Sequence, residues 1–260
     1  MLEATDPDNY ILVCPNHHRL IDRRVDDYPA EELRRIRDEH YADVEQGISA
    51  ALRSTDVNSR AVSGMAVALS VWERLDYEHK EEFWQQLFSD TPGCLLPLLG
   101  GRAYELKGKC YVGGKGFRNI GGNILDFLAT YPGNSACIEI KTPGTALMSG
   151  KPAYRNNVYL PHDELVGACT QVLESRRRLV ENLMSLNYAE PPEGRVMAPS
   201  PACYVIIGNL EREQMDSGRR NSFELFRSSL RDVTVVTFDE LFNGLKLLLD
   251  SVLSEDEGDA

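Results

Sequence analysis

Glu139 and Lys141 lie two residues apart in the stretch NSACIEIKTP, residues 134–143. Strand side chains alternate between faces, so Glu139 and Lys141 share one face while Ile138 and Ile140 share the other. A carboxylate can bind a divalent cation, and an ammonium group can hold a phosphate oxygen or orient an attacking water. The same alternation is typical of any half-exposed strand, so the pair can equally be two solvated side chains.

Asp126 adds a second carboxylate to this pattern. It lies in NILDFLATY, and the turn signal YPGNS between this segment and ACIEIK predicts an antiparallel hairpin. The hairpin would bring Asp126 alongside Glu139, where two carboxylates repel each other unless a cation neutralises them. Mg²⁺ suits such a pair because it takes one or two carboxylates and keeps several waters, and we expect Mn²⁺ to substitute for it. The alternative is a solvated hairpin face.

An Asp, a spacer with a turn, and then Glu-x-Lys resembles the motif of the PD-(D/E)xK nucleases. The resemblance implies that Asp126 and Glu139 are metal ligands and that Lys141 is the catalytic lysine. Leu125 stands where the motif has proline. This departure leaves the three chemically active positions intact.

The elements around the motif predict an α/β fold: a PD-(D/E)xK nuclease-like mixed sheet flanked by helices, with a small N-terminal strand–helix appendage. Helices are expected over roughly 61–90, over 162–186, at SFELFRSSL and after Thr237, and apolar strands at ACYVIIG and VTVVTF. The expected parts are an appendage at 1–55, a nuclease-like domain at 61–253 and an acidic tail at 254–260 that does not fold.

From about residue 78 to 250 the chain is similar to the nuclease domain of the Shedu anti-phage defence proteins. The similar segments occur in the expected order: EEFWQQLFSD, YVGGKGF with ILDFLATY, IEIKTPGTALM, YRNNVYLPHDELVGACTQV, and YVIIG with FELFRSSLRDVTVVTFDEL. The resemblance implies metal-dependent cleavage of phage DNA and assembly into homo-oligomers, expected as tetramers. It assigns a positioning role to Gln171 and an accessory acid to Glu82 or its neighbour Glu81, although ESRRRLV after Gln171 departs from the expected aromatic residue.

Charge is distributed unevenly along the chain. The formal net charge is -12, yet residues 101–160 hold eight basic and three acidic residues, which leaves +5 there and -17 elsewhere. An acidic exterior would suppress indiscriminate DNA binding and leave one productive basic face. The residues that we expect to contact DNA phosphates, unless they are ordinary solvated side chains, are Lys107, Lys109, Lys115, Arg118, Tyr154 and Arg155.

The N-terminal segment DNYILVCPNHHRLID resembles the second half of an HNH endonuclease module. Asn9 and His18 match the last Asn and His of that family, and Cys14 and His17 could supply half of a structural zinc site. The first half of the module is absent, and zinc needs four ligands, so we expect neither zinc nor catalysis there. We interpret the segment as an HNH remnant, or as a truncated start of the chain, that packs or mediates assembly.

Other patterns exclude several classes of protein. No apolar run approaches the ~18–20 residues of a membrane-spanning helix, and MLEATDPDNY lacks the features of a signal peptide, so we expect a cytoplasmic protein without a membrane partner. The glycines of VGGKGF do not form a P-loop, because Gly116 stands where Ser or Thr should be. Two alternatives stay open: a restriction- or repair-type nuclease of the same fold, and a catalytically silent module that binds DNA ends or a partner.

Overall fold

The computed structural model describes residues 21–25, 27–38, 57–74, 80–95, 97–100, 104–113 and 122–256. Chain contacts divide the protein into two units, Met1–Arg53 and Ser54–Ala260. In the first unit, residues 30–38 are helical and directly follow Pro29, a residue type that favours the start of a helix. The HNH-like positions Asn9, Cys14, His17 and His18 lie outside the described residues.

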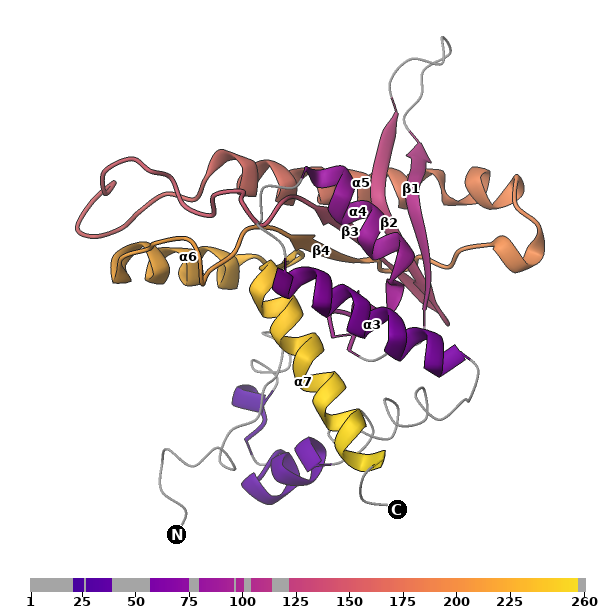
Figure 1. Ribbon diagram of the computed structural model, residues 1–260, viewed down its shortest axis with the longest axis horizontal. Coiled ribbons are helices and arrows are strands. Elements are labelled where there is room, and N and C mark those ends of the chain that lie inside the picture. The colour runs from indigo at the N-terminus through magenta and orange to yellow at the C-terminus, as the bar shows by residue number, and fades with distance from the viewer. Residues whose placement is uncertain are drawn as a thin grey trace. The chain divides into compact units, whose positions relative to one another are not determined.

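The second unit is built on a five-stranded mixed sheet whose strand order follows the chain (Figure 1). Its strands are β1 (Glu105–Gly113), β2 (Asn123–Tyr131), β3 (Asn134–Ile140), β4 (Ala202–Ile206) and β5 (Thr234–Val236). The first three strands pair antiparallel, whereas β3, β4 and β5 pair parallel. The predicted α/β class, with a mixed sheet flanked by helices, is confirmed.

The turn between β2 and β3 has the predicted chemistry. Pro132 fixes the first central position, and Gly133 takes the left-handed conformation at φ 84° in the second. The strands then pair antiparallel with Phe127 opposite Ile138. The predicted hairpin is therefore confirmed, and its register places the chemically active residues.

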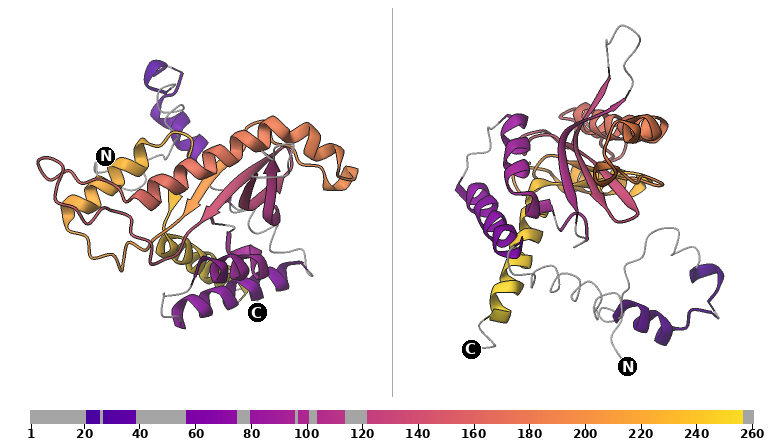
Figure 2. Two further views of the ribbon diagram at one scale, coloured as in Figure 1. Left: turned by 90° about the horizontal axis from the view of Figure 1, so that it is seen from above. Right: turned by 90° about the vertical axis from the view of Figure 1, so that its right-hand side faces the viewer.

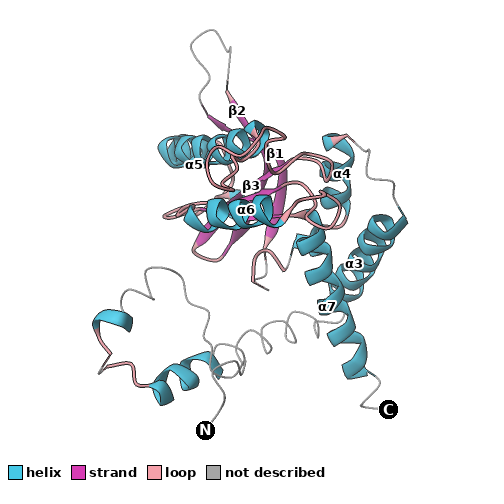
Figure 3. Ribbon diagram, turned by 90° about the vertical axis from the view of Figure 1, so that its left-hand side faces the viewer, coloured by secondary structure: helices cyan, strands magenta, loops and turns pink. Residues whose placement is uncertain are grey.

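Helices cover both faces of the sheet, as the views in Figures 2 and 3 show. On one face lie α3 (Val57–Arg74), α4 (Glu81–Asp90) and α7 (Phe238–Asp256), which pack against Phe127, Ile138 and other apolar side chains. On the other face lie α5 (Asp163–Tyr188) and α6 (Ser217–Ser229), which pack against a second cluster that includes Cys137 and Val205. The fold is a three-layer α/β sandwich.

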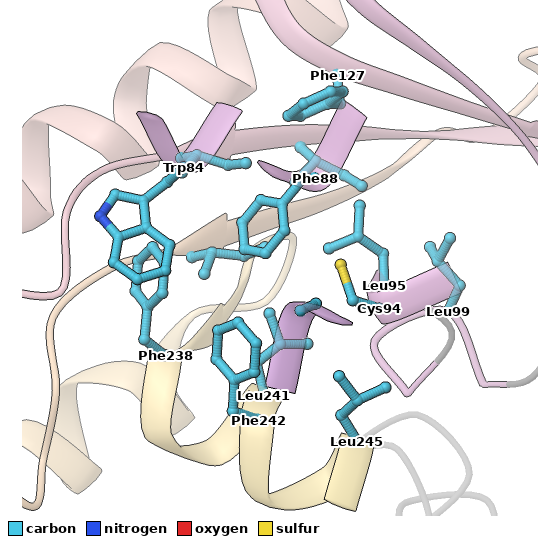
Figure 4. Close-up of a cluster of buried hydrophobic side chains, with 14 of the residues drawn as sticks. Trp84, Phe88, Cys94, Leu95, Leu99, Phe127, Phe238, Leu241, Phe242 and Leu245 are labelled. Carbon is cyan, nitrogen blue, oxygen red and sulfur yellow. The ribbon is translucent and has the colours of Figure 1, made fainter. Parts of the chain in front are cut away.

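Aromatic side chains dominate the layer beneath α4 (Figure 4). Trp84 and Phe88 from α4 meet Phe238 and Phe242 from α7, and Trp72 of α3 stacks on Phe242 with ring centroids 4.6 Å apart. Trp84, Phe88, Phe238 and Phe242 are all less than 2 % exposed, so burial of their large apolar surface fixes α4 on the sheet. The position of α4 matters because this helix also carries polar residues of the site.

Several predicted boundaries need correction. The single helical region expected over 61–90 is two helices, α3 and α4, and α4 ends at Asp90, directly before the breaker Thr91–Pro92. Helix α6 begins five residues before SFELFRSSL because Asp216 caps it, accepting the backbone N–H of Arg219 at 2.8 Å. Helix α7 continues to Asp256, into the segment expected as an unfolded tail. Among the described residues, no helix is long and apolar enough to cross a membrane.

Candidate active site

The candidate site lies where β2 and β3 separate. Phe127 and Ile138 are the last paired residues there, so Asp126 and Glu139 follow as neighbours at the end of the ladder. The side chain of Asp126 continues the pairing: its Oδ2 accepts the backbone N–H of Ile140 at 2.9 Å. The hairpin thus brings the two carboxylates together, as the alternation and the turn predict.

Glu139 is buried, with 1 % of its surface exposed. Its neighbours Ile138 and Ile140 belong to the apolar cluster beneath α4, and its own side chain points away from that cluster. The alternative of a solvated strand face is therefore wrong for Glu139. A buried carboxylate requires partners, and Lys141 supplies one, donating from Nζ to Glu139 Oε1 at 2.8 Å.

The second oxygen of Glu139 differs from the first. Glu139 Oε2 is buried and has no hydrogen-bond partner among the described residues. The pKa of Glu139 is raised to about 7, chiefly by burial and then by the charge of Asp126, against the opposing effect of Lys141. An unpaired, buried carboxylate oxygen beside a second carboxylate is costly in the protein alone, and it is an available ligand for a cation.

Lys141 connects the strand to helix α4. Its Nζ lies 2.8 Å from Glu139 Oε1 and 3.5 Å from Glu81 Oε2. Burial lowers the pKa of Lys141, but the hydrogen bond with Glu139 and the charges of Glu139, Glu81 and Asp126 outweigh burial, so the net shift is upward. Lys141 therefore stays protonated at neutral pH and is held by two carboxylates.

Helix α4 contributes Glu81 and Gln85. Gln85 Nε2 donates to Glu81 Oε1 at 3.0 Å and to Asp126 Oδ1 at 2.7 Å. One amide therefore links the carboxylate of α4 to that of β2. Of the two acidic candidates on this helix, Glu81 is the one that joins the group, whereas Glu82 is exposed on the outer side. Adjacent helical residues differ by about 100° around the axis, so Glu82 cannot share the inner face with Glu81.

Two further polar contacts at the site, from Gln85 and Lys109, were missed by the sequence interpretation. Lys109 was expected to contact DNA, but its Nζ lies 3.3 Å from Asp126 Oδ1. The inward position of Gln85 could be predicted from the sequence, because residues 81, 84, 85 and 88 follow the helical spacing of one inner face that includes buried Trp84 and Phe88. The contact of Lys109 with Asp126 could not be predicted from the sequence, since its left-handed conformation, φ 50°, is unusual for lysine.

Other predicted residues lie away from this group. Gln171 is exposed on α5, and within the described residues its side chain makes no hydrogen bond. Lys107 Nζ donates to the backbone oxygen of Gly194 at 3.2 Å. Lys115 and Arg118 lie outside the residues that the structure describes.

Tyr154 and Arg155 lie in a small hairpin within the loop that follows β3. Asn156 and Asn157 both take positive φ, 41° and 64°, and close a tight turn in which Arg155 and Val158 pair. Tyr154 is 65 % exposed, and the guanidinium carbon of Arg155 lies 5.8 Å from the centre of its ring. The turn therefore presents an aromatic ring and a cation together to solvent.

The carboxylates fit a small divalent cation. Within the described residues, no group of three His, Cys, Asp or Glu side chains converges as a complete metal cage. Mg²⁺ does not need one, because it binds through one or two carboxylates and retains waters. Asp126 and the unpaired oxygen of Glu139 supply this donor set. The cysteines give no alternative, since none of the five that the structure describes belongs to a group of three possible metal ligands.

Fold and site together define a three-layer α/β protein with a carboxylate–lysine centre at a strand fork. The model of the Shedu protein SduA C-terminal family matches residues 78–242. The chain is 36% identical over 194 residues to the Shedu protein SduA of Bacillus cereus (strain B4264). This chain belongs to the SduA family of Shedu proteins. The alignment covers 72% of this chain and 50% of the relative, so the chain spans about half the length of the curated protein that it matches.

Proposed function

We propose that this protein is a Mg²⁺-dependent DNA endonuclease that nicks or cleaves phosphodiester bonds in bacterial anti-phage defence, acting in the cytoplasm. The observation that carries the proposal is the buried carboxylate of Glu139. It has one oxygen bound to Lys141, the other without a partner, and Asp126 beside it. A purely structural ion pair does not require an unpaired buried oxygen or a second carboxylate.

Asp126 and Glu139 would hold the metal. When bound there, Mg²⁺ supplies Lewis-acid stabilisation and a water of lowered pKa. Lys141 is protonated and fixed between Glu139 and Glu81, so its ammonium group can hold a non-bridging phosphate oxygen as negative charge grows on it. Gln85 keeps Asp126 and Glu81 in place from α4. Tyr154 and Arg155 are assigned to the DNA backbone, which their exposure and pairing support.

The test is a cleavage assay on supercoiled and linear DNA, in Mg²⁺, in Mn²⁺ and in chelator. We expect nicks or breaks with either metal and none in chelator. Glu139→Gln and Lys141→Met should be inactive while remaining folded, since each removes one member of the centre. Binding of DNA without scission in either metal would instead favour a silent DNA-end module, and full activity of both variants would overturn the assigned site.

We also propose that the active form is a homo-oligomer, with a tetramer as the expected assembly, as the family resemblance implies. Light scattering coupled to size-exclusion chromatography measures its mass directly. A monomeric mass together with full cleavage activity would contradict this part of the proposal and leave the nuclease assignment intact.

A further inference from the structure

We propose that Lys109 is a counter-charge for Asp126. Its ammonium group contacts this carboxylate in the metal-free protein and moves away when a cation binds there. Lys109 would thereby lower the affinity of the site for metal and set the concentration at which the metal binds. This inference rests on the proposed function, because it presupposes a cation at Asp126 and Glu139. It replaces the expected role of Lys109 as a contact to DNA phosphate.

The contacts of Asp126 show which of its partners can leave. Its Oδ2 accepts the backbone N–H of Ile140, and its Oδ1 accepts from both Gln85 and Lys109. Gln85 is 6% exposed and belongs to the packed face of α4, so it is held in place. The side chain of Lys109 is 59% exposed, and its contact is the longest of the three, at 3.3 Å. Lys109 is the partner that can exchange for another cation without repacking of the core.

The backbone of β1 is distorted at the residue that makes this contact. Lys109 takes a left-handed conformation at φ 50°, while the paired residues on either side are Gly108 with Phe127 and Cys110 with Leu125. The distortion lies directly opposite Asp126. A left-handed non-glycine residue is strained, and such strain persists where the surrounding structure imposes it, often at functional sites.

The same distortion reverses the faces of both strands. In β1, Leu106 packs with the cluster beneath α4, but Cys110, four residues later, packs with the cluster beneath α5. In β2, Phe127 packs beneath α4, but Leu125, two residues earlier, packs beneath α5. Side chains two apart in a regular strand share a face, so the reversal requires an irregularity between them. The side chains of β1 thus change from one face of the sheet to the other at Lys109, opposite Asp126.

The charges at the site explain why a removable cation is useful. Two lysines stand among three carboxyl groups here: Lys141 contacts Glu139 and Glu81, and Lys109 contacts Asp126. Without Lys109 the group would be more negative before any metal binds, and it would attract a divalent cation more strongly. Lys109 therefore stabilises the metal-free state at the expense of metal affinity.

Lys107 provides a matched control. It lies two residues away on the same strand, and its Nζ contacts Gly194 and Glu105 rather than Asp126. Lys107→Gln changes the net charge of the protein by the same amount as Lys109→Gln. The two variants consequently separate the local effect at Asp126 from the general effect of one lost positive charge.

The experiment measures Mn²⁺ binding to the metal-stripped full chain by titration calorimetry, and free Mn²⁺ by electron paramagnetic resonance, without DNA. We expect Lys109→Gln to bind Mn²⁺ about threefold to fivefold more tightly than wild type at low ionic strength. The difference should shrink as salt screens the exposed lysine. Lys109→Arg, which keeps the charge, and Lys107→Gln should both bind like wild type. A gain in affinity cannot result from partial unfolding.

Each outcome bears on one of the two proposals. Equal or weaker binding by Lys109→Gln, with clear binding by wild type, overturns the role of Lys109 and leaves the metal site standing. An equal gain in Lys107→Gln also overturns it, because the effect would then be general. Binding by Lys109→Gln alone, with none by wild type, supports it strongly. Failure of both to bind Mn²⁺ overturns the metal site and the counter-charge together.

Discussion

The carboxylate of Asp126 accepts the backbone N–H of Ile140, 2.9 Å away on the neighbouring strand. A side chain here occupies the place where a backbone carbonyl would continue the β2–β3 ladder. The strands can therefore separate without leaving a buried N–H unpaired. Because Asp126 is held by backbone as well as by Gln85, the fork at which the candidate site lies is a fixed feature of the fold.

The pairing of Lys141 with Glu139 predicts a specific pattern of stabilities. Lys141→Met should lower the free energy of unfolding by about 3 kcal/mol, because it leaves a buried carboxylate without its ammonium partner. Glu139→Met combined with Lys141→Met should recover most of this loss, since no charge remains unpaired. Urea denaturation followed by tryptophan fluorescence measures both, and cleavage should be absent in the double variant despite its recovered stability. If the double variant did not recover this stability, the Lys141–Glu139 pair would not be the origin of the stability lost in Lys141→Met.

The raised pKa of Glu139 predicts how stability depends on pH in chelator. The native state holds a proton on Glu139 up to about pH 7, whereas the unfolded chain loses it near the ordinary glutamate pKa of 4.5. The native state thus binds more protons between these values, so the contribution of Glu139 is fully present below about pH 4.5 and is lost as pH rises through 7. The difference amounts to at most about 3 kcal/mol.

The measurement compares the wild-type protein with Glu139→Gln across this range by denaturant titration in chelator. The amide keeps the shape of the side chain and does not titrate. The stability of wild type relative to Glu139→Gln should fall with increasing pH. A flat difference between pH 4.5 and 7 would mean that Glu139 is already ionised throughout.

Gln85 and Gln86 form a matched pair on α4. Gln85→Leu removes the amide that joins Asp126 to Glu81 and should lower stability by about 2 kcal/mol, because two site carboxylates lose a buried donor. Gln86 is exposed and contacts Asp90, so Gln86→Leu should stay within about 0.5 kcal/mol of wild type. We also expect weaker Mn²⁺ binding in Gln85→Leu alone. Equal metal affinity in the two variants would exclude a positioning role.

Gly218, in the first turn of α6, lies against the side chain of Asn157 in the hairpin that carries Tyr154 and Arg155. A Cβ at this position would lie 2.3 Å from Asn157 Oδ1, so Gly218→Ala should release Asn157 from the start of α6. We expect faster amide exchange in residues 153–158 and weaker DNA binding. Asn157→Gly, which removes the same contact from the hairpin side while accepting the positive φ, should have the same two effects.

Gly167→Ala is the control for this prediction. Nothing lies within 4 Å of a Cβ at Gly167, which occupies the interior of α5, so alanine should stabilise the helix by up to about 1 kcal/mol. Its hairpin exchange and DNA binding should match wild type. If Gly167→Ala weakened DNA binding as strongly as Gly218→Ala, the hairpin anchor would not be the cause.

The β2–β3 hairpin could be predicted from the sequence because its signals are local. Pro132 and Gly133 specify the turn, and the alternation of Ile138, Glu139 and Ile140 specifies the faces. The burial of Glu139 could not be predicted in this way. It depends on α5 and the β3–α5 loop covering the second face of the sheet, and these contacts join segments far apart in the chain.

The residues that α4 contributes to the candidate site could be predicted in part from the sequence. The spacing of Glu81 with Trp84, Gln85 and Phe88 places them on one helix face, whereas Glu82 falls outside it. This pattern favours Glu81 over Glu82 once α4 is recognised as a separate helix that begins at Glu81. Lys109 is different, because no glycine or asparagine marks its left-handed conformation. It lies at the position where the β1–β2 register skips from the pair Gly108–Phe127 to the pair Cys110–Leu125.

The strand order has a consequence for synthesis on the ribosome, since each strand of the sheet joins the one made just before it. Every residue of the carboxylate–lysine group has been translated once Lys141, the residue after β3, is added, before α5, α6 and α7 exist. The aromatic layer of Trp72 and Trp84 stays open until Phe238 and Phe242 arrive with the last helix. The nascent chain therefore acquires the chemical groups of the candidate site early, and the helices that fix their positions are completed only when translation is nearly finished.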